Sequence, residues 1–120
     1  MADVTLKQGD TQPPVIQTLY MGDGTVADLT DADILFKMRR LIGLVAGEGD
    51  ILIIEEGEAA SLGDPEDGVV KYEWAQGDTD IAGGYEAEWE VTFEDGEVLT
   101  FPNGGYLTIA ITPQIAGPTS

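Results

Sequence analysis

Residues 83–101, with the sequence GGYEAEWEVTFEDGEVLTF, place the tightest limit on how this chain can fold. Every second residue from Tyr85 to Phe93 is apolar, and the residues between them are glutamate or threonine. Successive side chains on a strand point to opposite faces, so this pattern predicts a strand with an aromatic inner face and an acidic outer face. Asp95-Gly96 then forms a turn pair that tolerates positive φ, and the apolar residues after it predict a β-hairpin.

This hairpin needs a second layer, because a lone hairpin is marginally stable in water and cannot cover side chains as large as Trp89 and Phe93. The rest of the chain supplies short apolar or alternating runs that are separated by glycine and proline turns. These runs are residues 3–7, 15–20, 26–29, 34–40, 51–55, 69–74 and 106–111. We therefore predict an all-β fold, a sandwich or barrel of about eight short antiparallel strands.

Within this fold we expect four aromatic residues to anchor the core, namely Trp74, Tyr85, Trp89 and Phe93. The length of 120 residues fits one domain, which we assign to residues 1–111, with residues 112–120 as a flexible C-terminal tail. We interpret residues 41–49 as a loop or weak strand. The acidic residues 56–68 read as an exposed connection with one helical turn near residues 58–62.

Composition excludes several classes of function. The chain has no cysteine and no histidine, so it cannot form disulfides, thiolate metal sites or a serine–histidine catalytic system on its own. With 23 acidic and 5 basic residues its net charge is −18, which disfavours binding to nucleic acid or anionic membranes. Its apolar runs are strand-sized, and its N-terminus does not resemble a signal peptide. The excess acid fits a solvated coat, a saline habitat or a basic partner.

The tripeptide Gly-Asp-Thr occurs twice, at residues 9–11 and 77–79. Asp78 and Asp80, joined by Asp10, are weak candidates for an irregular calcium site. The EF-hand pattern fails, because a frame starting at Asp78 has Trp89 where the twelfth position requires glutamate. We favour the simpler interpretation that these short side chains bond their own backbone in turns, and we predict no metal or other cofactor.

Three of the five basic residues, Lys37, Arg39 and Arg40, lie on one predicted strand. They form either a solvated strand face or a contact with an acidic neighbour. The many carboxylates include no pair that the sequence marks for acid–base chemistry, so we predict that the chain is not an enzyme.

The order and spacing of several short motifs resemble a known family. They are LKQGDT at residues 6–11 with PP at 13–14, GDG at 22–24, ADLT at 27–30, ILFKMR at 34–39, VVKYEW at 69–74, GDTD at 77–80, GGY at 83–85, AEW at 87–89 and FPNGGYL at 101–107. Together they are similar to the N-terminal domain of the phage baseplate upper protein (BppU-type), a family that includes small phage structural proteins.

This resemblance implies an immunoglobulin-like β-sandwich that acts as an attachment module in the virion. The chain stops soon after the domain, without a helical stalk or a receptor-binding head. We therefore expect a tail, baseplate or neck adaptor, assembled in the host cytoplasm and present in several symmetric copies beside other virion proteins. A capsid decoration protein is the first alternative. A carbohydrate- or calcium-binding sandwich for host-surface recognition is the second.

Overall fold

The computed structural model describes residues 2–41, 51–102 and 105–115. These residues contain eight strands, one short 3-10 turn, η1, and no α-helix. The strands are β1 (Val4–Lys7), β2 (Val15–Thr18), β3 (Asp33–Arg40), β4 (Ile51–Ser61), β5 (Val69–Tyr72), β6 (Gly83–Thr92), β7 (Val98–Phe101) and β8 (Leu107–Thr112), and η1 covers Pro65–Asp67. The predicted all-β fold is confirmed.

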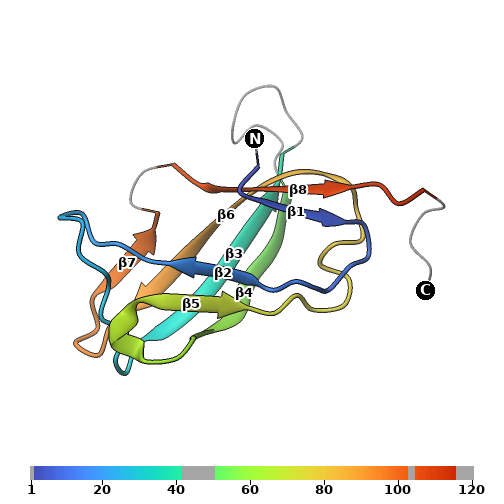
Figure 1. Ribbon diagram of the computed structural model, residues 1–120. Helices are drawn as coiled ribbons and strands as arrows, with labels where there is room; N and C mark the ends of the chain where they lie inside the picture. The colour runs from blue at the N-terminus through green and yellow to red at the C-terminus, as the bar shows by residue number, and fades with distance from the viewer. Residues whose placement is uncertain (1, 42–50, 103–104, 116–120) are drawn as a thin grey trace.

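The strands form two layers that share β4 (Figure 1). Hydrogen-bonded neighbours follow the order β1-β8-β6-β3-β4-β5-β2, and β7 also pairs with β6. In the larger layer β4 pairs with β3, for example Ile34 with Ala59. One residue later β4 joins the smaller layer, where Ala60 pairs with Lys71 of β5. The path therefore folds back on itself and leaves β1 and β2 as its two end strands.

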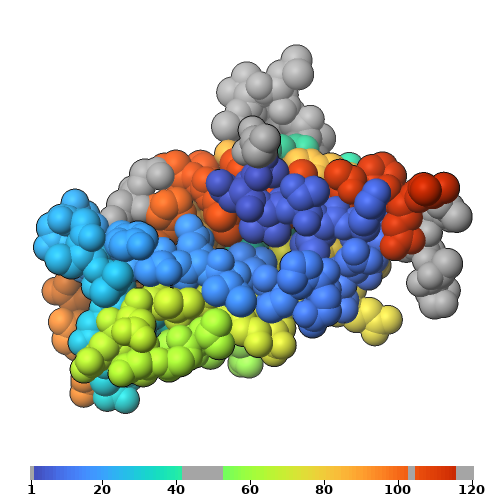
Figure 2. All heavy atoms as spheres, in the orientation of Figure 1, coloured from blue at the N-terminus to red at the C-terminus, as the bar shows by residue number. Residues whose placement is uncertain are grey.

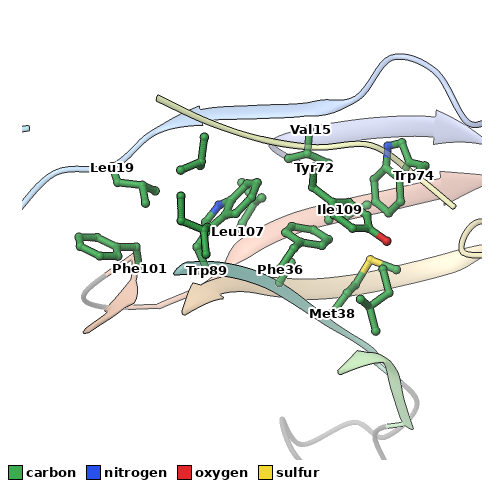
Figure 3. Close-up of a cluster of buried hydrophobic side chains, with 14 of the residues drawn as sticks. Val15, Leu19, Phe36, Met38, Tyr72, Trp74, Trp89, Phe101, Leu107 and Ile109 are labelled. Atoms are coloured by element: carbon green, nitrogen blue, oxygen red, sulfur yellow. The ribbon is translucent and has the colours of Figure 1, made fainter. Parts of the chain in front are cut away.

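The core fills the space between these layers. Along β6 every second side chain from Tyr85 to Val91 is buried, as the alternation predicted. Trp89 is completely buried, and its indole Nε1 donates a hydrogen bond to Gln17 Oε1 of the other layer at 2.7 Å. Phe36 of β3 stacks on Tyr72 of β5 with ring centroids 4.6 Å apart (Figure 3). Aromatic contacts across the layers thus hold the sandwich together.

Of the four predicted core anchors, Trp74, Tyr85 and Trp89 are buried. Phe93 differs, because it lies one residue beyond the end of β6 and is only half-buried against the edge of the core. It lies at the start of the turn that leads to β7, where its backbone N–H donates to the Glu97 carbonyl.

Four features of the chain path differ from the sequence prediction. The acidic segment at residues 56–61 continues β4, and the helical turn lies at Pro65–Asp67, after the expected position. Residues 26–29 make no strand, only a single bridge between Tyr20 and Val26. The strands are also not all antiparallel, since β1 pairs with β8 in parallel.

Some predictions concern segments that the structure does not describe. The expected loop at residues 41–49 falls there apart from Leu41, and so does most of the expected tail, residues 116–120. Thr112, which we assigned to the tail, is the last residue of β8. Within the described residues, no helix has the length and apolar character needed to span a membrane.

Candidate functional site

The outward side of β3 and β6 carries two ion pairs between neighbouring strands, and we call it the charged face. It consists of Lys37 and Arg39 on β3 and Glu86, Glu88 and Glu90 on β6. The alternation of both strands places these side chains outward, and the antiparallel register sets Lys37 opposite Glu88 and Arg39 opposite Glu86.

Ion pairs cross this face. Arg39 donates to Glu86 Oε1 from Nη2 at 2.7 Å and from Nε at 3.2 Å. Lys37 turns away from its direct neighbour, and its Nζ lies 3.0 Å from Glu90 Oε2. Hydrogen bonding to Glu86 raises the pKa of Arg39. These side chains are one-third exposed or less, so their attraction is screened less by solvent than that of a fully exposed pair.

Beside these pairs lies a shallow hollow with a volume of about 180 Å³. The guanidinium carbon of Arg39 lies 4.8 Å from the ring centroid of Tyr106, the residue just before β8. Tyr106 is 43% exposed, so its ring is available to solvent next to fixed charges. No local pattern in the sequence pointed to Tyr106, because its contact with Arg39 depends on how β3, β6 and β8 are placed.

Arg40 does not join the other two cations. It follows Arg39 on β3 and therefore points to the opposite side, where its Nη2 donates to the Ala82 carbonyl at 3.4 Å. A Cβ at Gly83 would lie 3.3 Å from Arg40 Nε, so the guanidinium lies against this glycine. Arg40 Nε is buried and has no hydrogen-bond partner within the part of the chain that the structure describes. The predicted cationic group is thus divided between two sides.

The two Gly-Asp-Thr segments lie against each other, and the hydrogen bonds between them are accepted by backbone carbonyls and not by the aspartate carboxylates. Thr79 is completely buried, and its Oγ1 donates to the Asp10 carbonyl at 2.7 Å. Gly9 N–H donates to the Thr79 carbonyl at 2.9 Å, and Gln8 Nε2 donates to the Asp80 carbonyl at 2.7 Å. These bonds fasten the connection before β2 to the connection before β6.

The carboxylate of Asp78, one of the weak metal candidates, accepts hydrogen bonds within the turn that contains it. Its Oδ2 accepts hydrogen bonds from Tyr72 Oη at 2.6 Å and from Ala75 N–H at 2.8 Å. Within residues 2–41, 51–102 and 105–115, no three acidic side chains come together in a way that would hold a metal ion. The structure therefore does not gather Asp78, Asp80 and Asp10 into such a group within the residues that it describes.

The outward side of β2 and β5 carries a different kind of surface, which we call the apolar face. Its exposed members are Ile16, Tyr20, Val26 and Leu62, with the half-buried Val69 among them. The alternation of residues 15–20 does not by itself show which side of the strand is exposed. A usable signal was present, because residues 11–22 contain no charged residue in a chain with 28 of them.

Compared with protein-family models, curated proteins and solved structures, the chain has no match. Its function is therefore inferred from its own residues. They offer the charged face, the apolar face and a set of turns held by acidic side chains.

Proposed function

We propose that this chain is a non-catalytic structural protein of a phage virion, an attachment module in the tail, baseplate or neck. The observation that carries the proposal is the use of the charged side chains. On the charged face they join β3 to β6, and in the turns they hold the backbone. Charged side chains that are paired within the domain stabilise its strands and turns, and this use supports a structural role.

The turn carboxylates show the same use throughout the described chain. Asp23 accepts from Thr25, Asp28 from Thr30, Asp64 from Glu66 N–H and Asp95 from Glu97 N–H. Asp3 Oδ2 accepts from the Thr108 N–H at 2.9 Å and so links the start of β1 to β8. Such bonds fix turns that would otherwise open, which suits a domain whose surface must fit fixed partners.

The resemblance to the BppU-type N-terminal domain supports the virion assignment. The motifs that carry it are turns and core positions, such as Gly22-Asp23-Gly24 at the turn after Tyr20 and the buried Trp74 and Trp89. A sandwich with rigid strands and two contrasting outer faces suits a protein that is held between neighbours in a repeated assembly.

Copy number tests this proposal. Virions produced by the phage or prophage that encodes the chain would be purified, and the chain would be quantified by mass spectrometry against the major capsid protein. We expect about a dozen copies, or another small multiple of three or six, as a tail, neck or baseplate ring requires. Hundreds of copies would make it a capsid decoration protein. Its absence from the particle would overturn the virion assignment.

One observation favours host-surface glycan binding as a second function. Tyr106 borders two hollows, the one beside Arg39 and a larger one of about 430 Å³ that reaches Asp3, Ile16 and Gln17. Small-molecule sites combine an aromatic surface with a few polar groups in this way. Glycans of the host envelope, with and without calcium, should then raise the melting temperature of the wild type but not of Tyr106→Ala. No shift in the wild type would remove this candidate.

A further inference from the structure

The two longest runs without a charged residue lie at residues 11–22 and 98–120. All 23 acidic and all 5 basic residues lie outside them. Two copies of a chain with a net charge of −18 repel each other over most of their surfaces. These two runs are therefore the segments through which one copy can contact another with the least electrostatic repulsion.

The first run contains β2, an end strand that pairs with β5 along one edge only. Just after β2, the Leu19 N–H donates to the Gly68 carbonyl on the β5 side. Alternate residues of a strand direct their backbone groups to the same side, so the backbone groups of Ile16 and Thr18 point away from β5. This second edge of β2, which we call the free edge, can accept a strand from another molecule.

A hollow of about 430 Å³ borders the free edge. The buried Val15 and Leu107 line it together with Gln17. Gln17 Oε1 accepts the hydrogen bond from Trp89, whereas Gln17 Nε2 donates to no group in the part of the chain that the structure describes. Asp3 is the one charged residue at the hollow, and its carboxylate already accepts hydrogen bonds from β8. The hollow can therefore take an apolar side chain and a backbone carbonyl.

The second run ends with the segment that follows β8, residues 113–120, which we call the C-terminal segment. Its apolar residue Ile115 is completely exposed. Between Pro113 and Pro118 lie four residues that keep their backbone N–H groups, as many residues as β2 contains. Because proline cannot donate to a strand ladder, these four residues can pair as one short strand with a proline on each side.

Ile115 does not reach the hollow of its own chain. The hollow lies beside Leu107 at the start of β8, and Thr112 at the end of that strand is about 17 Å away. Ile115 is three residues beyond Thr112, a length of at most about 10 Å, and the segment would have to reverse direction within it. The Gln8 N–H donates to the Thr112 carbonyl, so the segment leaves β8 beside the end of β1. Figure 2 shows β1 and β2 in blue on the side toward the viewer, with the residues after β8 projecting at the right.

We propose that the C-terminal segment of one copy of this chain adds to the free edge of β2 in a second copy. Ile115 fills the hollow of the second copy against Val15 and Leu107, and Gln17 Nε2 donates to a backbone carbonyl of the added segment. The segment and the free edge are different surfaces, so the contact is head-to-tail. Such contacts produce a ring when the rotation closes and an open chain when it does not.

A peptide titration tests the site directly. The full-length Ile115→Asp variant, whose own C-terminal segment is disabled, would be isotopically labelled and titrated with a synthetic peptide of residues 112–120. We expect saturable NMR shifts of the Gln17 side-chain amide and of the Ile16 and Thr18 backbone amides, with a dissociation constant below about 1 mM. The absence of saturable shifts would overturn the proposal, and so would shifts confined to the outward side of β3 and β6.

Two matched controls identify the groups that bind. A peptide that carries Ile115→Asp should bind at least about tenfold more weakly, because it places a charge in the apolar hollow. In the protein, Thr18→Pro removes an N–H from the free edge and leaves the ladder with β5 intact, so it should abolish peptide binding. Circular dichroism checks that this variant is folded. Equal affinities of the two peptides would show that Ile115 does not enter the hollow and would overturn the proposal.

Self-association of the intact chain is the second measurement. Analytical ultracentrifugation of the wild type should show an average mass that rises with protein concentration and passes that of a dimer, as a head-to-tail contact requires. Ile115→Asp should remain a monomer. Val98→Asp is the control, because Val98 is 54% exposed on β7 within the same uncharged run, and it should assemble like the wild type. A wild type that stays monomeric up to about 0.5 mM, or equal assembly by Ile115→Asp, would overturn the proposal.

This inference goes beyond the proposed virion role and can fail separately from it. A monomeric chain that is found in purified particles would disprove the head-to-tail contact and leave the attachment role standing. A chain that assembles head-to-tail but is missing from particles would have the opposite meaning.

Discussion

On the outward side of β3 and β6, lysine and arginine form ion pairs with glutamates of the neighbouring strand, whereas the outward side of β2 and β5 exposes isoleucine, tyrosine and leucine. Both faces cover the same core, and both belong to strands with strict alternation. The charged face binds its own side chains to each other. The apolar face instead exposes hydrophobic side chains, such as Ile16 at 53% and Leu62 at 41%, and a functional explanation must account for this difference.

The comparison suggests that the two outer faces of the sandwich have different roles. Cross-strand ion pairs stiffen the larger layer at little cost in solubility, since the remaining carboxylates stay hydrated. The apolar face exposes a cluster of hydrophobic side chains in a chain of net charge −18, and such clusters mark interaction sites more often than single exposed side chains do.

The largest predicted effect tests whether the inner and outer sides of β6 are assigned correctly. Trp89→Ala should lower the free energy of unfolding by about 3–5 kcal/mol, because it empties a fully buried site between the layers. Glu88→Ala, one residue away on the charged face, should change it by less than about 0.5 kcal/mol. Urea unfolding followed by circular dichroism measures both values. Similar losses for the two variants would mean that the register of β6 is wrong.

The next prediction compares two buried tyrosines, one on the inner side of the apolar face and one on the inner side of the charged face. Tyr72 of β5 donates its hydroxyl hydrogen bond to the Asp78 carboxylate, and Tyr85 of β6 donates to the Ile81 carbonyl. Tyr72→Phe should cost about 1.5–3 kcal/mol, because its partner is charged, and Tyr85→Phe about 0.5–1.5 kcal/mol. The same unfolding measurement ranks them. The reverse order would show that Asp78 is held mainly by the Ala75 N–H.

These tyrosines also predict alkaline behaviour. Burial raises the pKa of Tyr72, with a further contribution from its hydrogen bond to Asp78, and burial raises the pKa of Tyr85. Tyrosines in the unfolded chain ionise near pH 10, so their contribution to stability is complete below that pH and declines as the pH rises above it. The decline should be shallower in Tyr72→Phe than in the wild type, as measured by urea unfolding between about pH 8 and 11. An unchanged slope would contradict the assigned burial.

A smaller effect compares the ion pairs of the two faces. Arg39→Ala should lower the free energy of unfolding by about 1 kcal/mol, because it removes a two-bond contact with Glu86 and the contact with the Tyr106 ring. Lys71→Ala on the apolar face should change it by no more than about 0.5 kcal/mol, because its contact with Glu73 is long and exposed. Urea unfolding at low salt measures both values. At 1 M salt the difference between the variants should shrink, and a difference that persists would mean that the Arg39 effect is packing.

Much of the larger layer was predictable, because alternation is a local property of the chain. The inner positions of β3 and β6 follow from a period of two, and the turn at Asp95-Gly96 follows from backbone preferences. The ion pairs were not predictable. They require the register that sets Arg39 opposite Glu86, 47 residues later in the chain.

The second half of β4 shows why a local rule can fail. Its residues 56–61 are acidic or small and have no preference for strands. They nevertheless pair with β3 and β5 and form the part of β4 that joins the two layers. Gly57 looked like a loop residue, but it is needed for close packing. A Cβ there would lie 2.7 Å from Tyr72 Cε1 and 2.9 Å from the Phe36 carbonyl oxygen. Likewise, the parallel pairing of β1 with β8 joins distant ends of the chain, which no local pattern reveals.

The smallest effect concerns the acidic turns that contain Asp23 and Asp28. Hydrogen bonds from the Thr30 hydroxyl and N–H lower the pKa of Asp28, and Thr25 lowers the pKa of Asp23 in the same way. Any stability that these carboxylates add is therefore present above their unfolded pKa, near 3.9, and is lost as the pH falls through the lower folded pKa. In Thr30→Ala, carboxyl titration by NMR should show the pKa of Asp28 rising toward its ordinary value while that of Asp23 stays fixed.

Thr25→Ala is the reciprocal control and should move the pKa of Asp23 alone. If neither substitution changes the pKa of its neighbouring aspartate, the turns are held by their backbone hydrogen bonds, and the threonine hydroxyl groups contribute little. If both behave as expected, these turns remain negatively charged at mildly acid pH. Any stability that these carboxylates add should then be unchanged between about pH 7 and 5 and should decline only at lower pH.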